Sequence, residues 1–273
     1  MKIIANPFEV KEYLKTVPMR IGFVPTMGAL HEGHLSLIKK AKEENDFVVV
    51  SIFVNPTQFL QGEDLDSYPK KDAADKKICE LAGVDLLFMP NAEGMYGVDE
   101  VTLQAPNVRG YVLEGTSRPG HFSGVLQVVM KLLNIVQPTK AYFGKKDAQQ
   151  LHLITLMVQN FYMSVEIVPV DTVRESDGLA MSSRNVYLSQ EEHQEALKIS
   201  KSLKMATQLV MQKNFVSSEI KNAMRNTLAP LEISYVEILN RNFELLQEVE
   251  IGNTIVLVEA LVGRTRLLDN LWL

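Results

Sequence analysis

Two histidines at a short spacing are the side chains of this sequence best suited to chemistry. His31 and His34 stand three residues apart in the stretch PTMGALHEGH, residues 25–34, which follows a short apolar run at 21–24. Imidazoles at a helix start can donate N–H groups to a phosphate, and the helix dipole favours an anion there. The spacing therefore predicts a phosphate site at a strand-to-helix turn.

Two other interpretations of the pair have to be weighed. An isolated H-x-x-H is more often a solvated surface pair, and two histidines can also bind zinc. The sequence has no H-E-x-x-H pattern and no further ligand cluster near the pair. Gly28 and Gly33 would let the backbone approach a bound group. We therefore favour phosphate binding.

Neutral polar side chains follow the next apolar run, residues 47–54. In FVNPTQF, residues 53–59, Asn55 and Gln58 can each donate and accept hydrogen bonds, which suits a hydroxylated substrate. An ordinary Asn-Pro turn is the alternative. His121 lies in RPGHF, residues 118–122, where a plain basic turn and a substrate contact are about equally good interpretations.

Cations and hydroxyl groups gather in two later segments. Residues 144–147, Gly-Lys-Lys-Asp, follow an apolar run and open a helical pattern, so Lys146 could hold phosphate while Asp147 caps the helix or binds ribose. Residues 181–185, Met-Ser-Ser-Arg-Asn, place two hydroxyl groups beside Arg184, which suits a polyphosphate. Solvated charge and a hinge loop are the alternatives.

The elements that must position these residues alternate in type. Apolar runs at 21–24, 47–54, 86–89, 141–143 and 165–170 predict strands, and amphipathic stretches at 34–44, 68–82, 124–136 and 147–161 predict helices. Strands that alternate with helices indicate right-handed crossovers and a parallel sheet.

The character of the sequence changes after residue 176. Ser189 and Glu192 form a capping-box pattern before a helix to about residue 213, and a second helix is predicted at 217–228. Runs at 234–239, 254–260 and 265–268 predict a small separate sheet. We expect an N-terminal domain over 1–176 and a smaller lid domain over 177–273.

Composition limits the class of protein. The chain has 273 residues, of which 46% are hydrophobic and 22% charged, so it can bury a core. Its single cysteine excludes an internal disulfide, and its net charge of −5 gives no sign of a nucleic-acid partner. We expect a cytoplasmic globular protein with neither secretory leader nor membrane helix.

Taken together, the motifs resemble the pantoate–β-alanine ligase (pantothenate synthetase) family, which belongs to the nucleotidylyltransferases with an H-x-G-H motif. The resemblance runs from about residue 3 to residue 270 and rests on PTMGALHEGH, FVNPTQF, RPGHFSGV, FGKKDAQQ and MSSRN, in the family's order. It implies an α/β protein whose N-terminal domain holds a Rossmann-like parallel sheet, with a smaller α+β C-terminal domain.

The resemblance also implies a set of site residues, with His34 as the catalytic histidine. Gln58 and Gln150 match pantoate-binding glutamines, Gln58 also lying beside the β-alanine site, and Asp72 resembles an acidic position near the metal. Lys145 stands where many relatives have glutamate. The residues that match ATP contacts are Met27, Gly28, Ala29, Leu30, His31, Glu32, Gly33, His34, Gly144, Lys145, Lys146, Asp147, Val173, Met181, Ser182, Ser183 and Arg184.

The activity implied is ATP-dependent condensation of pantoate with β-alanine through pantoyl adenylate, with Mg²⁺ as cofactor, in a homodimer. His31, His34, Lys146 and Arg184 would serve the phosphates. One alternative is a nucleotidyltransferase that joins AMP to a phosphorylated acceptor, although the neutral Gln58 and Gln150 do not suit such an acceptor. Another is an RNA-binding relative, which the net charge disfavours.

Overall fold

The computed structural model describes residues 1–273, which fold into two compact units. The first unit contains Met1–Gly144 and Leu153–Asp171, and the second contains Lys145–His152 and Thr172–Leu273. None of the helices combines the length and the apolar character required to cross a bilayer.

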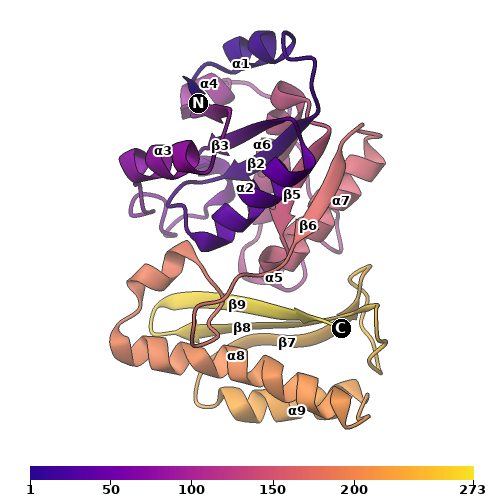
Figure 1. The fold of residues 1–273 in the computed structure, drawn as a ribbon. Helices are drawn as coiled ribbons and strands as arrows, with labels where there is room; N and C mark the ends of the chain where they lie inside the picture. The colour runs from indigo at the N-terminus through magenta and orange to yellow at the C-terminus, as the bar shows by residue number, and fades with distance from the viewer. The chain divides into compact units, whose positions relative to one another are not determined.

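A six-stranded parallel sheet forms the centre of the first unit (Figure 1). Its spatial order is β1-β4-β3-β2-β5-β6. The five strands expected from the apolar runs are all present, and the sheet confirms the predicted α/β class. The strands are β1 (Lys2–Ile4), β2 (Ile21–Thr26), β3 (Phe47–Ile52), β4 (Leu86–Phe88), β5 (Lys140–Gly144) and β6 (Glu166–Val170).

Helices cover this sheet on both faces. Right-handed crossovers place α2 and α3 on one face and α6 and α7 on the other, because the chain runs from β2 toward β4 in one direction and from β4 toward β6 in the opposite one. The helices are α1 (Pro7–Leu14), α2 (Glu32–Glu44), α3 (Asp72–Leu81), α4 (Ala92–Met95), α5 (Glu114–Ser117), α6 (His121–Val136) and α7 (Ala148–Asn160), with 3₁₀ turns η1 (Pro56–Gln58) and η2 (Lys145–Asp147).

The direction of winding reverses between β2 and β5, which are neighbours in the sheet. Open parallel sheets bind ligands at the carboxyl ends of their strands, at such a reversal. The stretch that contains both histidines leaves β2 at this edge, and NPTQF leaves β3 at the same edge. The topology thus brings two of the predicted motifs of the first unit to one end of the sheet.

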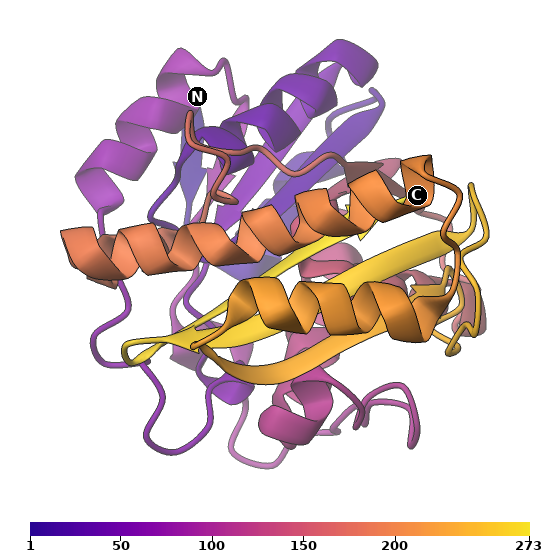
Figure 2. The same ribbon diagram turned by 90° about the horizontal axis from the view of Figure 1, so that it is seen from below.

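The second unit is built on an antiparallel sheet of β7 (Glu232–Asn240), β8 (Thr254–Val262) and β9 (Thr265–Trp272), in that order. The helices α8 (Gln190–Met211) and α9 (Ser217–Leu228) lie side by side across one face of it (Figure 2). Ser189 and Glu192 form the predicted capping box at the start of α8. The expected small antiparallel sheet, accompanied by helices in an α+β arrangement, is confirmed.

Two predicted helices have different starts. The helix expected from residue 68 begins at Asp72, because Pro69 disfavours a helical conformation of Tyr68. Helix α6 starts earlier than expected, at His121, so this histidine lies at a helix start. Strand β1 and helix α1 were not expected at all; α1 begins with Asn6 as its cap and Pro7 in its first turn.

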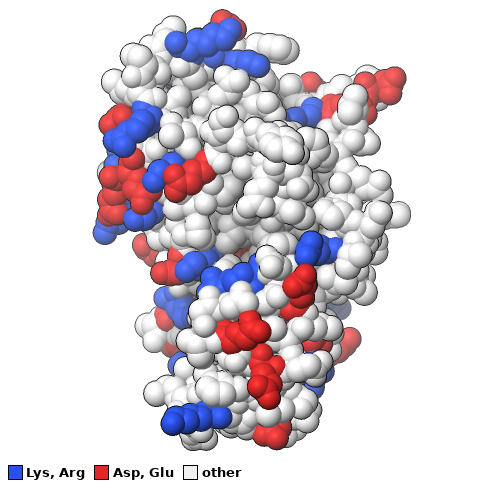
Figure 3. All heavy atoms as spheres, turned by 90° about the vertical axis from the view of Figure 1, so that its right-hand side faces the viewer, with Lys and Arg blue, Asp and Glu red and all other residues white.

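Charged side chains of both signs are interspersed on the face of the molecule drawn in Figure 3. Blue and red groups alternate there over short stretches, and that face carries no continuous basic stripe. A binding surface for a nucleic-acid backbone would require such a stripe on one of the faces.

The carboxylate of Glu44 links α2 to β5 and makes stability depend on pH. Hydrogen bonds from Lys40, Lys140 and Tyr142 lower the pKa of Glu44 from 4.5 to about 2. The stabilisation is complete above the unfolded-state pKa and is lost as pH falls from 4.5 toward 2.

Substitution of Glu44 should reduce this pH dependence. In Glu44→Gln we expect the melting temperature to fall less than in the wild type as pH falls from 4.5 toward 2. Thermal unfolding followed by circular dichroism at several pH values measures this, with the exposed Glu43→Gln as control; parallel curves for wild type and Glu44→Gln would contradict it.

Candidate active site

The turn between β2 and α2 has an unusual backbone. Gly28 and Ala29 both have positive φ, 88° and 50°, and only the first is a glycine. The hydroxyl of Thr26 accepts a hydrogen bond from the Gly28 N–H at 3.3 Å and donates one to the Ser51 carbonyl at 2.8 Å. A residue with a side chain, such as Ala29, needs stabilisation from its surroundings to keep a positive φ.

That stabilisation comes from Asp75 on α3. Its carboxylate, in a side chain only 1% exposed, accepts hydrogen bonds from the N–H groups of Ala29 and Leu30, both at 2.8 Å. Hydrogen bonds to a charged group are the stronger kind and fix the turn. Asp75 was not among the predicted site residues. The signal that could have found it is an acid on the buried face of α3, one turn before the buried Cys79.

The two histidines lie together at the start of α2. His31 is the cap residue, and its Nδ1 accepts the Gly33 N–H at 3.1 Å, while Nδ1 of His34 accepts the His31 N–H at 3.3 Å. Their ring centroids are 4.2 Å apart. Because each Nδ1 accepts a hydrogen bond, the proton of each neutral ring is on Nε2. The predicted pair is therefore built as two oriented Nε2–H donors at a helix N-terminus.

The NPTQF segment holds Gln58 through Asn55. Asn55 is 1% exposed, and its amide donates to Gln58 Oε1 and to the Gly124 carbonyl, both at 3.2 Å. Its oxygen accepts from Tyr96 at 2.6 Å and from Thr57. The amide of Gln58 therefore points its oxygen at Asn55 and its nitrogen at Met27, whose sulfur is 2.9 Å away.

A glycine allows this segment to pack against α6. A Cβ atom built on Gly124 would overlap the carbonyl oxygen of Thr57. The helix and the η1 turn can approach this closely only because residue 124 has no side chain. The second glycine of the RPGHFSGV motif, Gly124, thus positions the Asn55 and Gln58 side chains.

His121 also supports Gln58, from the other side. Its Nδ1 is 2.7 Å from the Gln58 carbonyl oxygen, and its Nε2 is 3.0 Å from the Arg118 guanidinium. Since arginine only donates, Nε2 accepts and Nδ1–H donates to the carbonyl. Glu63 accepts two further hydrogen bonds from Arg118. Burial alone would raise the pKa of Glu63, but the bonds from Arg118 and Leu60 outweigh it, and the pKa lies below its ordinary value.

In the second unit, the lysines of FGKKDAQQ form the short η2 turn that leads into α7. Lys146 Nζ lies 3.4 Å from a carboxylate oxygen of Asp147. Asp147 is thus both the last residue of the turn and an ion-pair partner of Lys146. Gln150 is half-buried in the first turn of α7.

The segment before α8, which includes MSSRN, is a compact loop. Met181 N–H donates to the Val173 carbonyl at 3.0 Å, and Ser182 caps the 3₁₀ turn η3 (Ser183–Tyr187) by accepting from Arg184 N–H. The structure thus places Val173 beside the start of MSSRN.

Two acidic positions differ in setting. Asp72 is exposed at the first residue of α3. In the second unit, Glu175 and Asp177 lie near His193, whose Nε2 is 2.7 Å from Asp177. The hydrogen bond from His193 lowers the pKa of Asp177. The ion pair between His193 and Asp177 accounts for the close approach of the side chains in this cluster.

Comparison with known proteins decides the family. The family model described as pantoate-beta-alanine ligase matches residues 2–272. The chain belongs to the pantoate-beta-alanine ligase family. The expected family membership and the expectation of an enzyme are confirmed.

Relatives within the family are similar over their whole length. The pantothenate synthetase of Sulfurimonas denitrificans is 67% identical over 273 residues, which is all of both chains, and that of Aliarcobacter butzleri is 54% identical with the same coverage. A pantothenate synthetase structure from Thermus thermophilus has a TM-score of 0.94 at 40% identity and covers 99% of each chain. The ligase of Francisella tularensis, a complex with beta-gamma ATP and beta-alanine, has a TM-score of 0.82 at 36% identity over 100% of this chain and 97% of its own.

The role of Asp75 leads to a prediction on stability. Asp75→Asn can accept only one of the two N–H groups and turns its NH₂ toward the other, so we expect a loss of about 1–3 kcal/mol in the free energy of unfolding. Urea unfolding measures this. The matched control on the same helix is the exposed Asp72→Asn, expected to stay within about 0.5 kcal/mol of the wild type. Equal effects of both substitutions would contradict the role given to Asp75.

Proposed function

We propose that this ligase condenses pantoate with β-alanine through pantoyl adenylate and releases AMP and pyrophosphate. The observation that carries the proposal is the pair of Nε2–H donors of His31 and His34 on a turn fixed by Asp75. Family membership and the ligands of the Francisella tularensis relative support it.

The proposed reaction has two steps. A carboxylate oxygen of pantoate attacks the α-phosphorus of ATP, and the bond to the β-phosphate oxygen breaks, releasing pyrophosphate. The amine of β-alanine then attacks the activated carbonyl carbon, the bond to the AMP oxygen breaks, and the nitrogen loses a proton. An amine cannot expel oxide from a free carboxylate, whereas AMP is a competent leaving group, so activation must come first.

The histidines are assigned to the first step. Negative charge shifts onto the phosphate oxygens as pantoate attacks, and preorganised N–H donors stabilise such charge. Their orientation is set in advance by the bonds to Nδ1. We also assign Lys146 and Arg184, both of the second unit, as phosphate contacts. The remaining proposed ATP contacts are Met27–Leu30, Glu32, Gly33, Gly144, Lys145, Asp147, Val173 and Met181–Ser183.

Gln58 and Gln150 are proposed to hold pantoate. The neutral amide groups suit the hydroxyl groups of this acid, and Gln58 is fixed by the protein around it. For Asn55 and His121 we propose a positioning role toward Gln58, because their hydrogen bonds hold its amide and its carbonyl.

Mg²⁺ is proposed to enter as part of the substrate MgATP. Protein sites usually hold this ion through one or two carboxylates together with substrate phosphates and water. The exposed single carboxylate of Asp72 fits one such contact and does not form a cage of its own. When bound, the ion neutralises phosphate charge.

The other proposals concern the whole chain. We propose residues 1–176 as the ATP- and pantoate-binding domain, residues 177–273 as the smaller lid domain, and the cytoplasm, where ATP is supplied, as the location. A homodimer is also proposed. Light scattering at micromolar concentration should then give twice the chain mass of 30.7 kDa.

The experiment that tests the proposed function is exchange of labelled pyrophosphate into ATP. It should occur with pantoate present and β-alanine absent, because adenylation is reversible before the amine arrives. Exchange that needs β-alanine, or that proceeds without pantoate, would overturn the adenylate route. A phosphorylated acceptor that replaces pantoate would point to a nucleotidyltransferase.

Substitution of the two glutamines should affect pantoate more than ATP. Each of Gln58→Ala and Gln150→Ala leaves substrate hydroxyl groups without a partner, so we expect a loss of about 1–3 kcal/mol in pantoate binding. Separate titrations with pantoate and with ATP measure this. A variant that loses ATP affinity while keeping pantoate affinity would refute the assignment.

Substitution of His34 should separate the two half-reactions. His34→Ala removes a donor to the phosphates, so adenylation should slow by about 10²–10³-fold. Aminolysis of supplied pantoyl adenylate should slow far less, since pyrophosphate has already left. Single-turnover kinetics of each step measure this, with circular dichroism to verify folding. Equal slowing of both steps would mean that His34 organises the whole pocket.

A further inference from the structure

Strand β9 carries two adjacent polar side chains in the interior of the second unit. Asp269 and Asn270 are each 3% exposed. Burial of a carboxylate and a carboxamide is costly unless hydrogen bonds satisfy them. Their partners include the lysine turn, which we assign to ATP, and Arg174, which adjoins the proposed ATP contact Val173.

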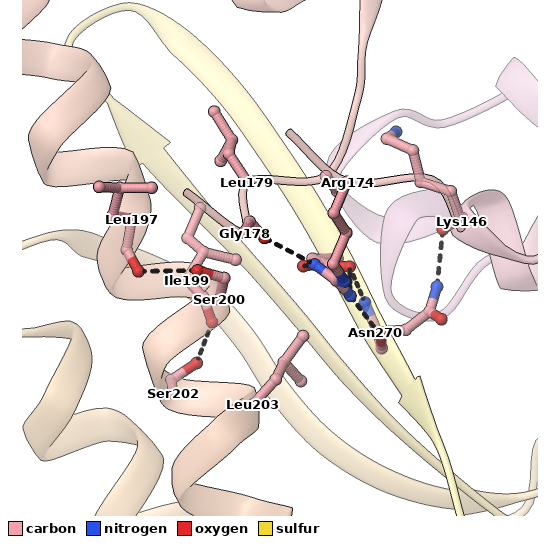
Figure 4. Close-up of polar contacts among 12 residues, drawn as sticks. Lys146, Arg174, Gly178, Leu179, Leu197, Ile199, Ser200, Ser202, Leu203 and Asn270 are labelled. Atoms are coloured by element: carbon pink, nitrogen blue, oxygen red, sulfur yellow. Dashed lines mark hydrogen bonds and ion pairs between the residues drawn. The ribbon is translucent and has the colours of Figure 1, made fainter. Parts of the chain in front are cut away.

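Asn270 holds the lysine turn. Its Nδ2 donates to the backbone carbonyl of Lys146 at 2.7 Å (Figure 4) and to that of Lys145 at 2.9 Å. Its Oδ1 accepts the indole N–H of Trp272 at 2.8 Å, which fixes the orientation of the amide. The Lys145 ammonium also lies over the Trp272 ring, 5.5 Å from the centroid. Both carbonyls flank the Cα atom of Lys146, so Asn270 sets the direction in which this side chain leaves the turn.

Asp269 holds the loop that carries MSSRN. Its carboxylate accepts two hydrogen bonds from the Arg174 guanidinium, at 2.6 and 3.0 Å. Arg174 also donates to the Gly178 carbonyl at 3.1 Å (Figure 4). It forms a backbone bridge with Ala180, one residue before Met181. The path from Asp269 to the MSSRN segment thus consists of two consecutive contacts.

The two anchors are also bonded to each other. Asp269 Oδ1 accepts the Asn270 N–H at 2.7 Å, and Arg174 reaches the Asn270 carbonyl at 3.4 Å. The dipeptide Asp269-Asn270 therefore fixes the lysine turn and the loop that carries MSSRN at the same time. Lys146 lies 124 residues before Asn270, and Arg174 lies 95 residues before Asp269.

We propose that Asp269 and Asn270 are positioning residues for adenylation, Asn270 acting through Lys146 and Asp269 through the loop of Arg184. This proposal rests on the proposed function. A displacement of about 1 Å in a group that meets the transition state can cost about 10²-fold in rate. Asn270→Asp, which turns a carboxylate oxygen toward two carbonyl oxygens, should therefore slow pantoate-dependent pyrophosphate exchange by about 10–10²-fold.

A double-mutant cycle tests the route through Lys146. In a Lys146→Arg background, which retains the charge, Asn270→Asp should slow exchange by less than about threefold, because the group it positions is already displaced. A parallel cycle combines Asp269→Asn with Arg184→Lys. If the rate losses of the two single variants simply multiply in the double variant of both cycles, the proposal is overturned. The control for added charge is Asn226→Asp, exposed on α9 and expected to match the wild type.

Fluorescence of Trp272 gives a readout that needs no turnover, since it is the only tryptophan of the chain. MgATP alone should change its emission in the wild type, because Lys145 lies over the ring. Asn270→Asp should lose most of this change while retaining its thermal unfolding transition. No change in the wild type, or an equal change in both proteins, would overturn the proposal. If the wild type shows no pantoate-dependent exchange, the proposed function fails, and the fluorescence comparison still decides the role of Asn270.

Discussion

A buried polar group is costly unless it is hydrogen-bonded, and the bonds that satisfy Asp75, Asn55 and Asn270 set the geometry of the site. The carboxylate of Asp75 has two backbone N–H groups of the phosphate turn as its partners. Those two bonds hold Ala29 at a positive φ that its side chain would otherwise disfavour. The start of α2, and with it the direction of both imidazoles, follows from that turn. Removal of the acid would leave the motif in the sequence without its geometry.

The same constraint explains why the donors assigned to substrates are oriented before any ligand arrives. Gln58 is held by Asn55 at its amide and by His121 at its carbonyl, and both of these residues are buried. A rigid donor loses little freedom when it meets a transition state, which is the basis of electrostatic preorganisation. The supporting residues Asp75, His121 and Asn270 lie on α3, α6 and β9, while the proposed contact residues lie at the ends of strands, in the turns that follow them and in the first turns of α2 and α7.

The sequence predicted the parallel sheet, a helix that begins near the two histidines and the capping box at Ser189, because each of these depends on residues close together in the chain. Asp75 escaped prediction because its partners are 45 and 46 residues away and no local pattern connects them. Asn55 was expected at the substrate, and the structure shows that its NH₂ group donates to Gln58 and to Gly124. The residue type determines which hydrogen bonds a side chain can form. The packing around that side chain determines which groups become its partners.

The segment Lys145–His152 belongs to the second unit although the chain on both sides of it belongs to the first. Its lysine carbonyls bond to Asn270, and His152 stacks on Phe243 with ring centroids 4.7 Å apart. A gene fragment that stops at Asp171 would keep this segment and lose its contacts with Asn270 and Phe243. No single cut in the chain between Gly144 and Thr172 leaves both units whole.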